Sequence, residues 1–294
     1  MRPGISAPNT SSLSIERIRS QLDQLSGEQR RAAVYALENP EIIALTSTRE
    51  AAAAAGVTPN TFVRLSRTLG FDGFKAFKTQ LARTSFQPTE QARQLQTRSA
   101  KGQMAGLYGD IMSAASINLQ SLMIDDQTHA MQAAARALNQ AKKVYVLGVG
   151  IANALAQNFA YLGGMALENI VALPRDGSEP ADGLIRAGAG DALIAMTFKP
   201  YRREVIEAVQ AAREQGMTLI AISDSPAAPH FVGATHAFQV PVEGPQFFIS
   251  TVALAAFLEA LMAFVIAGAP AKAVEDMERF HARRHRLGIY IEDQ

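Results

Sequence analysis

Short apolar runs alternate with helical patterns over the second half of the chain, and this alternation constrains the fold more than any other feature. The runs consist mainly of Val, Ile, Leu and Ala, which is typical of parallel strands buried on both faces. They predict strands at 144–148, 170–173, 192–197, 219–223 and 237–242. Helical patterns separate them at about 153–167, 179–187, 202–215 and 250–267. The sequence therefore predicts a doubly wound α/β domain with a parallel sheet.

The first part of the chain instead predicts short helices only. A first helix is expected where apolar residues recur at helical spacing, and two capping-box patterns mark later helix starts. These residues are Ile15, Ile18, Leu22 and Leu25 for the first helix, and Ser26 with Gln29 and Ser47 with Glu50 for the boxes. The second box opens a helix over 48–55, and Thr58-Pro59 opens another over 59–69. With Gly56 between them, this spacing indicates a helix-turn-helix.

The second of these two helices has an apolar face and a polar face. Phe62, Leu65 and Leu69 share one side and are expected to pack inward. Recognition helices read base edges mainly through their N-terminal turns, and nearby lysines contact phosphates. The residues expected to contact DNA are Thr58, Asn60, Thr61, Arg64, Arg67 and Lys75, with Lys78 as a further phosphate contact. The alternative is a helical protein-interaction bundle whose arginines are only solvated.

The charge distribution agrees with a DNA-binding front. The whole chain holds 28 basic and 27 acidic residues. Residues 1–85 hold eleven basic and seven acidic ones, and the remainder holds seventeen and twenty. Such an asymmetry is expected when only the first part meets a polyanion. The absence of cysteine excludes disulfides, thiolate metal sites and thiol-based sensing.

Two segments bear on localisation. Residues 1–12 lack the apolar run of a secretory signal and are expected to form a disordered leader. The segment 247–267 is long enough to span a bilayer. Glu259 near its middle is costly in hydrocarbon, which favours a helix buried in a core or an oligomer interface. We therefore expect a cytoplasmic protein.

Several short motifs in the first part resemble the N-terminal domain of the RpiR/MurR family of bacterial transcriptional regulators. They are Glu38-Asn39-Pro40, Ala55-Gly56-Val57, Thr61 with Arg64, and Leu69-Gly70-Phe71 with Gly73-Phe74. The resemblance implies a helix-turn-helix joined to a SIS (sugar isomerase) domain, which the α/β pattern also resembles. The expected organisation is a leader at 1–12, a helix-turn-helix domain at 13–86, a linker and connecting helix at 87–128, a SIS domain at 129–270, and a C-terminal helix and tail at 271–294.

The resemblance also implies a ligand site beyond the carboxyl ends of the strands, as in other parallel sheets. In SIS domains, hydroxyl-rich loops hold a sugar phosphate. The residues at the matching positions here are Gly148, Gly150, Asn153, Thr197, Lys199, Arg202, Glu243 and Ser250. A dinucleotide-binding enzyme would need a third glycine where Asn153 stands.

The loops depart from the family pattern, so the chemical identity of the ligand is not determined by the resemblance. No hydroxyl follows Gly150, and Pro200 removes an N–H that a phosphate cradle would use. Lys199 and Arg202 could bind a phosphate or carboxylate with charge instead. Alternatively they form a solvated helix start, and the domain binds an anionic or polyol metabolite of another kind, or no ligand. Ser250 could also be only the N-cap of the last apolar helix.

No pattern favours catalysis. Glu243 is the one obvious loop carboxylate for acid–base chemistry, and His230 and His236 each stand alone. His281 and His285 lie among arginines, which disfavours a zinc site. We expect a one-component repressor that binds operator DNA as a homodimer or homotetramer, responds to a small metabolite and needs no cofactor or metal. The alternative is a SIS-type sugar-phosphate isomerase or another carbohydrate-derivative-binding enzyme.

Overall fold

The computed structural model describes residues 18, 21–40, 43, 46–84, 88–124, 127–175 and 178–290. The chain divides into two compact units, of which Met1–Glu90 with Lys199–Tyr201 form the first and Gln91–Phe198 with Arg202–Gln294 form the second. We call them the helical unit and the sheet unit. The expected leader at 1–12 and Ile15 of the expected first helix lie outside the described residues.

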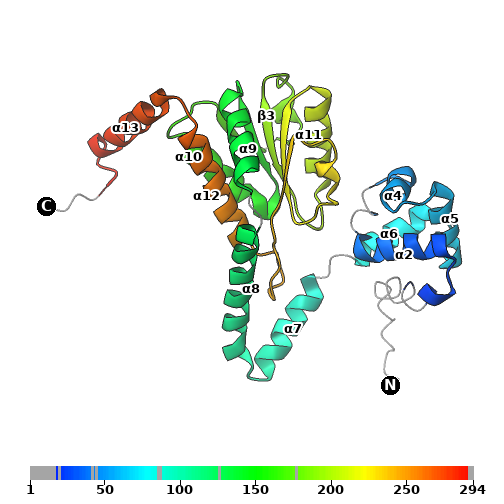
Figure 1. The fold of residues 1–294 in the computed structure, drawn as a ribbon. Coiled ribbons are helices and arrows are strands. Elements are labelled where there is room, and N and C mark those ends of the chain that lie inside the picture. The colour runs from blue at the N-terminus through cyan, green and yellow to red at the C-terminus, as the bar shows by residue number, and fades with distance from the viewer. Residues whose placement is uncertain are drawn as a thin grey trace. The chain divides into compact units, whose positions relative to one another are not determined.

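The helical unit contains a helix-turn-helix, as the capping signals predicted. Its elements are η1 (Leu22–Gln24), α2 (Gly27–Glu38), α4 (Thr48–Ala54), α5 (Pro59–Thr68) and α6 (Phe74–Thr84) (Figure 1). Helix α5 contacts α2, α4 and α6. Buried side chains from these helices form one core, with Ile18, Phe62, Leu65 and Phe77 fully enclosed.

The two predicted capping boxes have different outcomes. At the start of α4, Ser47 N–H donates to Glu50 Oε2 at 2.7 Å and Glu50 N–H donates to Ser47 Oγ at 3.3 Å, so this box forms. At the start of α2, the Ser26 hydroxyl donates to Gln29 Oε1 and caps no backbone N–H. Gln29 Nε2 donates to Thr68 Oγ1 at 3.1 Å, so that Gln29 ties α2 to α5 instead of closing a box.

Three helices precede the sheet. They are α7 (Pro88–Ala100), α8 (Met104–Ile124) and α9 (Thr128–Gln140). The predicted polar linker is therefore largely helical. An ion pair between Arg98 Nη2 and Asp110 Oδ2, at 2.7 Å, joins α7 to α8.

The predicted doubly wound sheet is confirmed. Its strands are β1 (Val144–Gly148), β2 (Ile170–Leu173), β3 (Ala192–Met196), β4 (Thr218–Ser223) and β5 (His236–Gln239). They lie in the order β2-β1-β3-β4-β5, and all neighbouring pairs are parallel. The remaining helices are α10 (Asn153–Gly163), α11 (Arg203–Glu214), α12 (Val252–Ala267) and α13 (Ala271–Arg286). Helices α9, α10 and α12 pack on one face of the sheet, and α11 packs on the other (Figure 1).

The prediction of a helix over 179–187 is wrong. Only a 3₁₀ turn, η3 (Asp182–Leu184), forms there. The segment contains Pro180 and Gly183, which both disfavour helix interiors. A Cβ on Gly183 would lie 2.4 Å from Leu173 Cδ2, so the glycine lets this connection approach the sheet closely. The result is an open connection where a covering helix was expected.

Much of the apolar helix α12 is buried in the protein core. This agrees with the expectation that Glu259 disfavours a membrane span and favours a core or interface helix. Its enclosed residues are Ala253, Leu254, Phe257, Leu258, Leu261, Met262 and Val265. Within the described ranges, no single helix is long and apolar enough to cross a membrane. Only α12 and α13 taken together pass that test, and a bend of 114° separates them.

Candidate DNA-binding and ligand sites

The turn between α4 and α5 requires glycine. Gly56 has φ +64°, a left-handed conformation that strains residues with a side chain. Val57 N–H donates to Ala52 O at 2.9 Å and Gly56 N–H to Ala53 O at 3.2 Å, which closes the end of α4. The direction of α5 relative to α4 is therefore set by backbone hydrogen bonds.

Aromatic packing then fixes the rotation of α5. Phe62 is fully buried and lies edge-on to Phe74, with ring centroids 5.5 Å apart. On the same face, the buried Ser66 hydroxyl donates to Phe62 O at 2.7 Å. With this face held in the core, the opposite face of α5 projects to solvent.

The outward face of the helix-turn-helix carries several exposed cations. Thr58, Asn60, Arg64 and Arg67 of the recognition segment are exposed, as is Lys75 at the start of α6. Among the described residues, no carboxylate forms an ion pair with Arg64, Arg67 or Lys75. Exposed cations without acidic partners are suited to phosphates and to base edges in the major groove.

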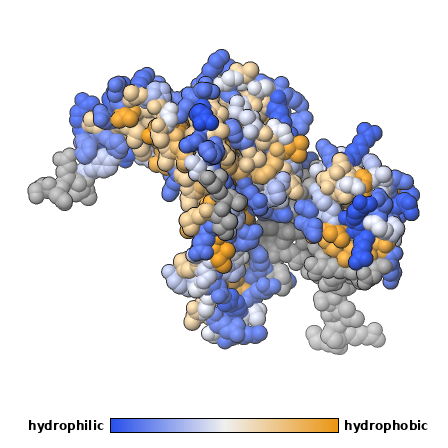
Figure 2. Space-filling view, viewed as in Figure 1, coloured by the Kyte–Doolittle hydropathy of each residue, from blue (hydrophilic) through white to orange (hydrophobic). Residues whose placement is uncertain are grey.

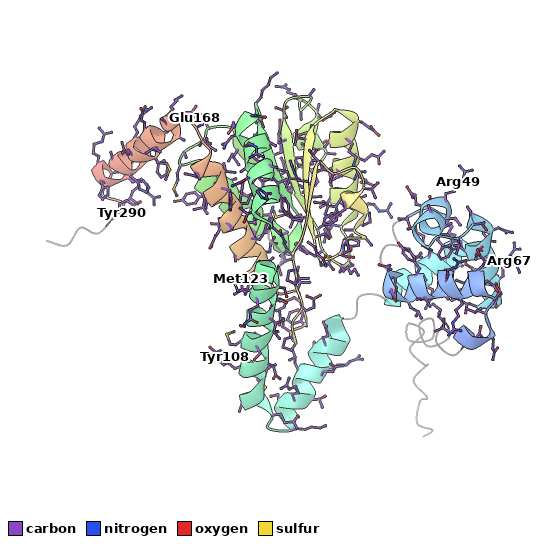
Figure 3. The ribbon with its side chains drawn as sticks, viewed as in Figure 1. Arg49, Arg67, Tyr108, Met123, Glu168 and Tyr290 are labelled. Carbon is purple, nitrogen blue, oxygen red and sulfur yellow. The ribbon has the colours of Figure 1, made fainter. Side chains whose placement is uncertain are left out.

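Arg49 belongs to the same group, and sequence reasoning did not include it in the DNA-contacting set. It lies in the first turn of α4, is exposed and has no ion pair to a described carboxylate. The labelled side chains of Arg49 and Arg67 both project from the helical unit in Figure 3. Its place within the confirmed capping box, between Ser47 and Glu50 in the helix that precedes the recognition helix, was the available signal.

Two of the residues predicted to contact DNA have partners within the protein. Thr61 is only 7% exposed, because it stands four residues before Leu65 and so shares the buried face of α5. Its hydroxyl lies 2.9 Å from the Thr58 hydroxyl and steadies the first turn. Lys78 donates from Nζ to Thr46 O at 2.7 Å, which ties α6 to the segment before α4.

The predicted ligand residues lie in three connections that follow strands of the sheet. The first loop, residues 148–153, joins β1 to α10. A Cβ on Gly148 would lie 2.4 Å from Ala152 O, and Gly150 has φ +64°, so both positions need glycine. Asn153 Nδ2 donates to Gly148 O at 3.1 Å and braces this turn. The turn leads into the N-terminus of α10, where backbone N–H groups favour an anion.

The second loop, residues 197–202, joins β3 to α11. Thr197 is buried, and its hydroxyl accepts from Arg202 N–H at 3.0 Å. Ser223, at the end of β4, donates from Oγ to Thr197 O at 2.8 Å. Lys199 lies between Thr197 and Arg202 in the chain and is partly exposed. Thr197 thus serves mainly to shape the loop from which Arg202 starts α11.

Arg202 brings the first two loops together. Its Nη1 lies 3.9 Å from the position that a Cβ on Gly150 would take. Its Nη2 pairs with Glu204 Oε1 at 2.6 Å, and this hydrogen bond is the main cause that lowers the pKa of Glu204 below its ordinary value. One edge of the guanidinium is therefore neutralised, while the other faces the glycine turn.

Glu243 and Ser250 lie in a third connection, which follows β5. Glu243 is exposed, and its Oε2 accepts from Val242 N–H at 3.1 Å. Ser250 is buried, and its N–H donates to Val242 O at 2.8 Å. The alternative of Ser250 as N-cap is wrong, because Thr251 holds that position on α12.

The histidines do not form a reactive cluster in the described part of the chain. His230 is fully buried, and its Nε2 lies 3.1 Å from Ile222 O. Burial, the largest cause, lowers its pKa to about 4. This is the structural role expected of a lone histidine. In the same described ranges, no group of three His, Cys, Asp or Glu side chains could hold a metal ion.

Two family models match the chain. Residues 13–88 match the helix-turn-helix domain of the rpiR family, and residues 137–267 match the SIS domain. An uncharacterized HTH-type transcriptional regulator from Caldanaerobacter subterraneus subsp. tengcongensis is 25% identical over 70% of this chain and 72% of its own length. The HTH-type transcriptional regulator HexR of Escherichia coli is 24% identical over 72% of each chain.

Solved structures share the fold. The Vibrio vulnificus NanR protein, complexed with ManNAc-6P, has a TM-score of 0.65 at 19% identity and covers 93% of this chain and 98% of its own. The sugar isomerase domain of an RpiR transcription factor from Sphaerobacter thermophilus has a TM-score of 0.56 at 24% identity, covering 60% of this chain and 98% of its own.

Proposed function

Because this chain belongs to the RpiR family of transcriptional regulators, we propose that its helix-turn-helix reads an operator and that its SIS domain changes operator affinity when a metabolite binds. The observation that carries this proposal is the exposed face of α5 and its flanks. Asn60, Arg64 and Arg67 on α5, Lys75 on α6 and Arg49 on α4 are exposed, and no carboxylate among the described residues pairs with these cations. Arginine suits guanine O6 and N7, and asparagine suits adenine N6 and N7.

The proposed effector is a sugar phosphate or a related anionic or polyol compound. Support comes from the edge of Arg202 that faces Gly150 and from the N-terminus of α10 beside it. NanR, which shares the fold, was solved with ManNAc-6P. In this proposal Gly148, Gly150, Asn153 and Thr197 shape the site, and Lys199, Arg202, Glu243 and Ser250 contact the ligand or orient it.

We further propose that the chain is a cytoplasmic repressor of transcription. It is proposed to have no isomerase activity, cofactor or membrane attachment. Glu243 is the candidate acid–base group, and its carboxylate already accepts the neighbouring Val242 N–H. The expected domain limits, 13–86 for the helix-turn-helix and 129–270 for the SIS domain, are part of this proposal.

The proposed assembly is a homodimer or homotetramer. Helix α8 carries large exposed apolar side chains, with Tyr108 72%, Ile117 61% and Met123 76% accessible. Figure 2 shows apolar surface over α12 that extends toward the upper part of α8, and Figure 3 shows Tyr108 and Met123 projecting from α8. Burial of such a patch by a second copy would pair two helix-turn-helix units for a palindromic operator.

The test begins with selection of bound fragments from fragmented genomic DNA by the full chain. The affinity for the selected fragment is then measured at fixed salt with and without a panel of sugar phosphates, sugar acids and polyols. The proposal expects one fragment bound at least about a thousandfold more tightly than random DNA. It also expects one compound that changes this affinity and is recovered unaltered after incubation. Turnover of any panel compound would favour the isomerase alternative.

A further inference from the structure

A cavity lined by cations lies in the sheet unit, apart from the three loops described above. Its volume is about 530 Å³. That value lies within the range of small-molecule sites, which is about 300–1,000 Å³. The polar residues that line it are Lys143, Tyr145, Arg175, Ser178, Asp182 and Arg186. None of them belongs to the ligand set that the SIS resemblance implies.

The cavity exists because the connection between β2 and β3 is open. A helix over 179–187 would have covered this part of the sheet, but only the η3 turn forms. Gly183 lines the cavity and packs against Leu173 so closely that a Cβ would meet Leu173 at 2.4 Å. The Ser178 hydroxyl donates to Arg175 O at 2.9 Å, which fixes the backbone that carries the arginine.

The lining has an excess of positive charge. Lys143, Arg175 and Arg186 contribute three cations, and Asp182 contributes one carboxylate. In the described parts of the chain, no ion pair neutralises any of the three cations. Lys143 Nζ lies over the Tyr145 ring, 5.4 Å from its centroid. An unneutralised group of cations at one concave surface attracts anions.

Tyr145 supplies a donor that stays protonated. Its side chain is 4% exposed and lies in the core that faces α11. Burial is the main cause that raises the pKa of Tyr145, Asp191 adds to the rise, and Arg175 opposes it. The phenol therefore remains a hydrogen-bond donor at neutral pH, next to the arginines.

We propose that this cavity is a second anion site, which binds a small soluble phosphorylated metabolite independently of the effector loops. The two guanidinium groups match the oxygens of a phosphate, because each presents parallel N–H donors. Lys143 adds a point charge, and Tyr145 adds a neutral donor. The volume exceeds that of one phosphate group, so the class is a phosphate ester or a diphosphate.

The test titrates inorganic pyrophosphate into the full chain by calorimetry at constant ionic strength. All proteins carry Arg202→Gln, so that the guanidinium of the proposed effector site does not contribute an anion contact. Arg175→Gln and Arg186→Gln should each weaken pyrophosphate binding about tenfold, because each removes a charge-assisted contact. Arg283→Gln removes the same charge from an exposed position on α13 and should leave the binding unchanged.

A second measurement uses the unsubstituted chain. Pyrophosphate should slow chemical acetylation of Lys143, read by mass spectrometry, while the adjacent Lys142, which does not line the cavity, reacts at the same rate as before. Binding that persists in both arginine variants, absence of binding at millimolar pyrophosphate, or equal protection of Lys142 and Lys143 would each overturn the proposal. One further result would overturn the proposal. If Arg175→Gln reduces the salt dependence of DNA binding and leaves the pyrophosphate affinity unchanged, the cations of the cavity contact DNA instead.

Discussion

The side-chain amide of Asn118 on α8 donates a hydrogen bond of 2.7 Å to the backbone carbonyl of Glu243, 125 residues further along the chain. Asn118 is 3% exposed, although most of α8 is not enclosed. The bond joins the helix that follows α7 in the chain to the third loop of the proposed effector site. Asn118 is therefore placed to pass a movement of that loop to the connection that leads to the helix-turn-helix.

Asn118→Ala should uncouple the effector from DNA. Loss of the amide leaves the Glu243 carbonyl without this donor, which should lower stability by about 1–3 kcal/mol. The ratio of operator affinities with and without effector, measured by fluorescence anisotropy, should fall toward one. Gln120→Ala removes an exposed amide from the same helix and should keep the ratio. If Asn118→Ala keeps the affinity ratio of the unsubstituted chain, Asn118 does not couple the effector to DNA binding.

Arg64→Ala should weaken operator binding by about 1–3 kcal/mol and relax the choice of one base pair. The measurement is a titration of the operator and its single-base variants at fixed salt. Lys75→Ala gives the contrast, because a phosphate contact should weaken all sequences alike and reduce the salt slope by about one. Arg31, on α2, pairs with Glu28, and Arg31→Ala should change neither quantity. Unchanged affinity in Arg64→Ala would remove this residue from the interface.

Arg202→Ala should abolish the thermal shift that the effector produces. The substitution removes the guanidinium edge that faces Gly150 and leaves Glu204 without its partner. The adjacent Arg203 is also exposed, so Arg203→Ala is the matched control and should respond as the unsubstituted chain does. If Arg202→Ala keeps the full shift, the effector binds elsewhere.

Stability should depend on the protonation of His230. Its pKa is about 4 in the folded chain against an ordinary value of 6.5. Between these values the unfolded chain binds a proton that the folded chain excludes. The free energy of unfolding should therefore decrease as the pH falls from 6.5 to 4, by about 3 kcal/mol in total. Urea denaturation at several pH values measures this.

The control for the pH dependence is His129→Gln, which alters an exposed histidine and should keep the slope. His230→Gln should flatten the slope between pH 6.5 and 4, whatever its effect on stability at pH 7. An unchanged slope in His230→Gln would assign the dependence to other groups.

Much of the fold follows from local patterns in the sequence. Buried parallel strands are continuous apolar runs, and the start and end of both β1 and β2 agree with prediction to the residue. The failure at 179–187 also has a local cause, because Pro180 and Gly183 outweigh the apolar spacing there. Thr61 was misplaced because one helical position, 100° of rotation, separates an outward residue from a buried one.

The site contacts could not be predicted in the same way. The approach of Arg202 to Gly150, and the bond from Asn118 to Glu243, join residues far apart in the chain. No periodicity specifies such pairs, because they depend on how strands and helices pack in three dimensions. The cation-lined cavity likewise depends on a helix that does not form.

Effector control of DNA binding is tested by the dissociation constant of the full chain for its selected operator. This constant is measured by fluorescence anisotropy at fixed salt, with and without the effector found in the metabolite panel. We expect a change of about 5- to 150-fold, with the same factor appearing in the effector affinity when operator DNA is present. Equal operator affinity at every effector concentration, with the effector demonstrably bound, would contradict it.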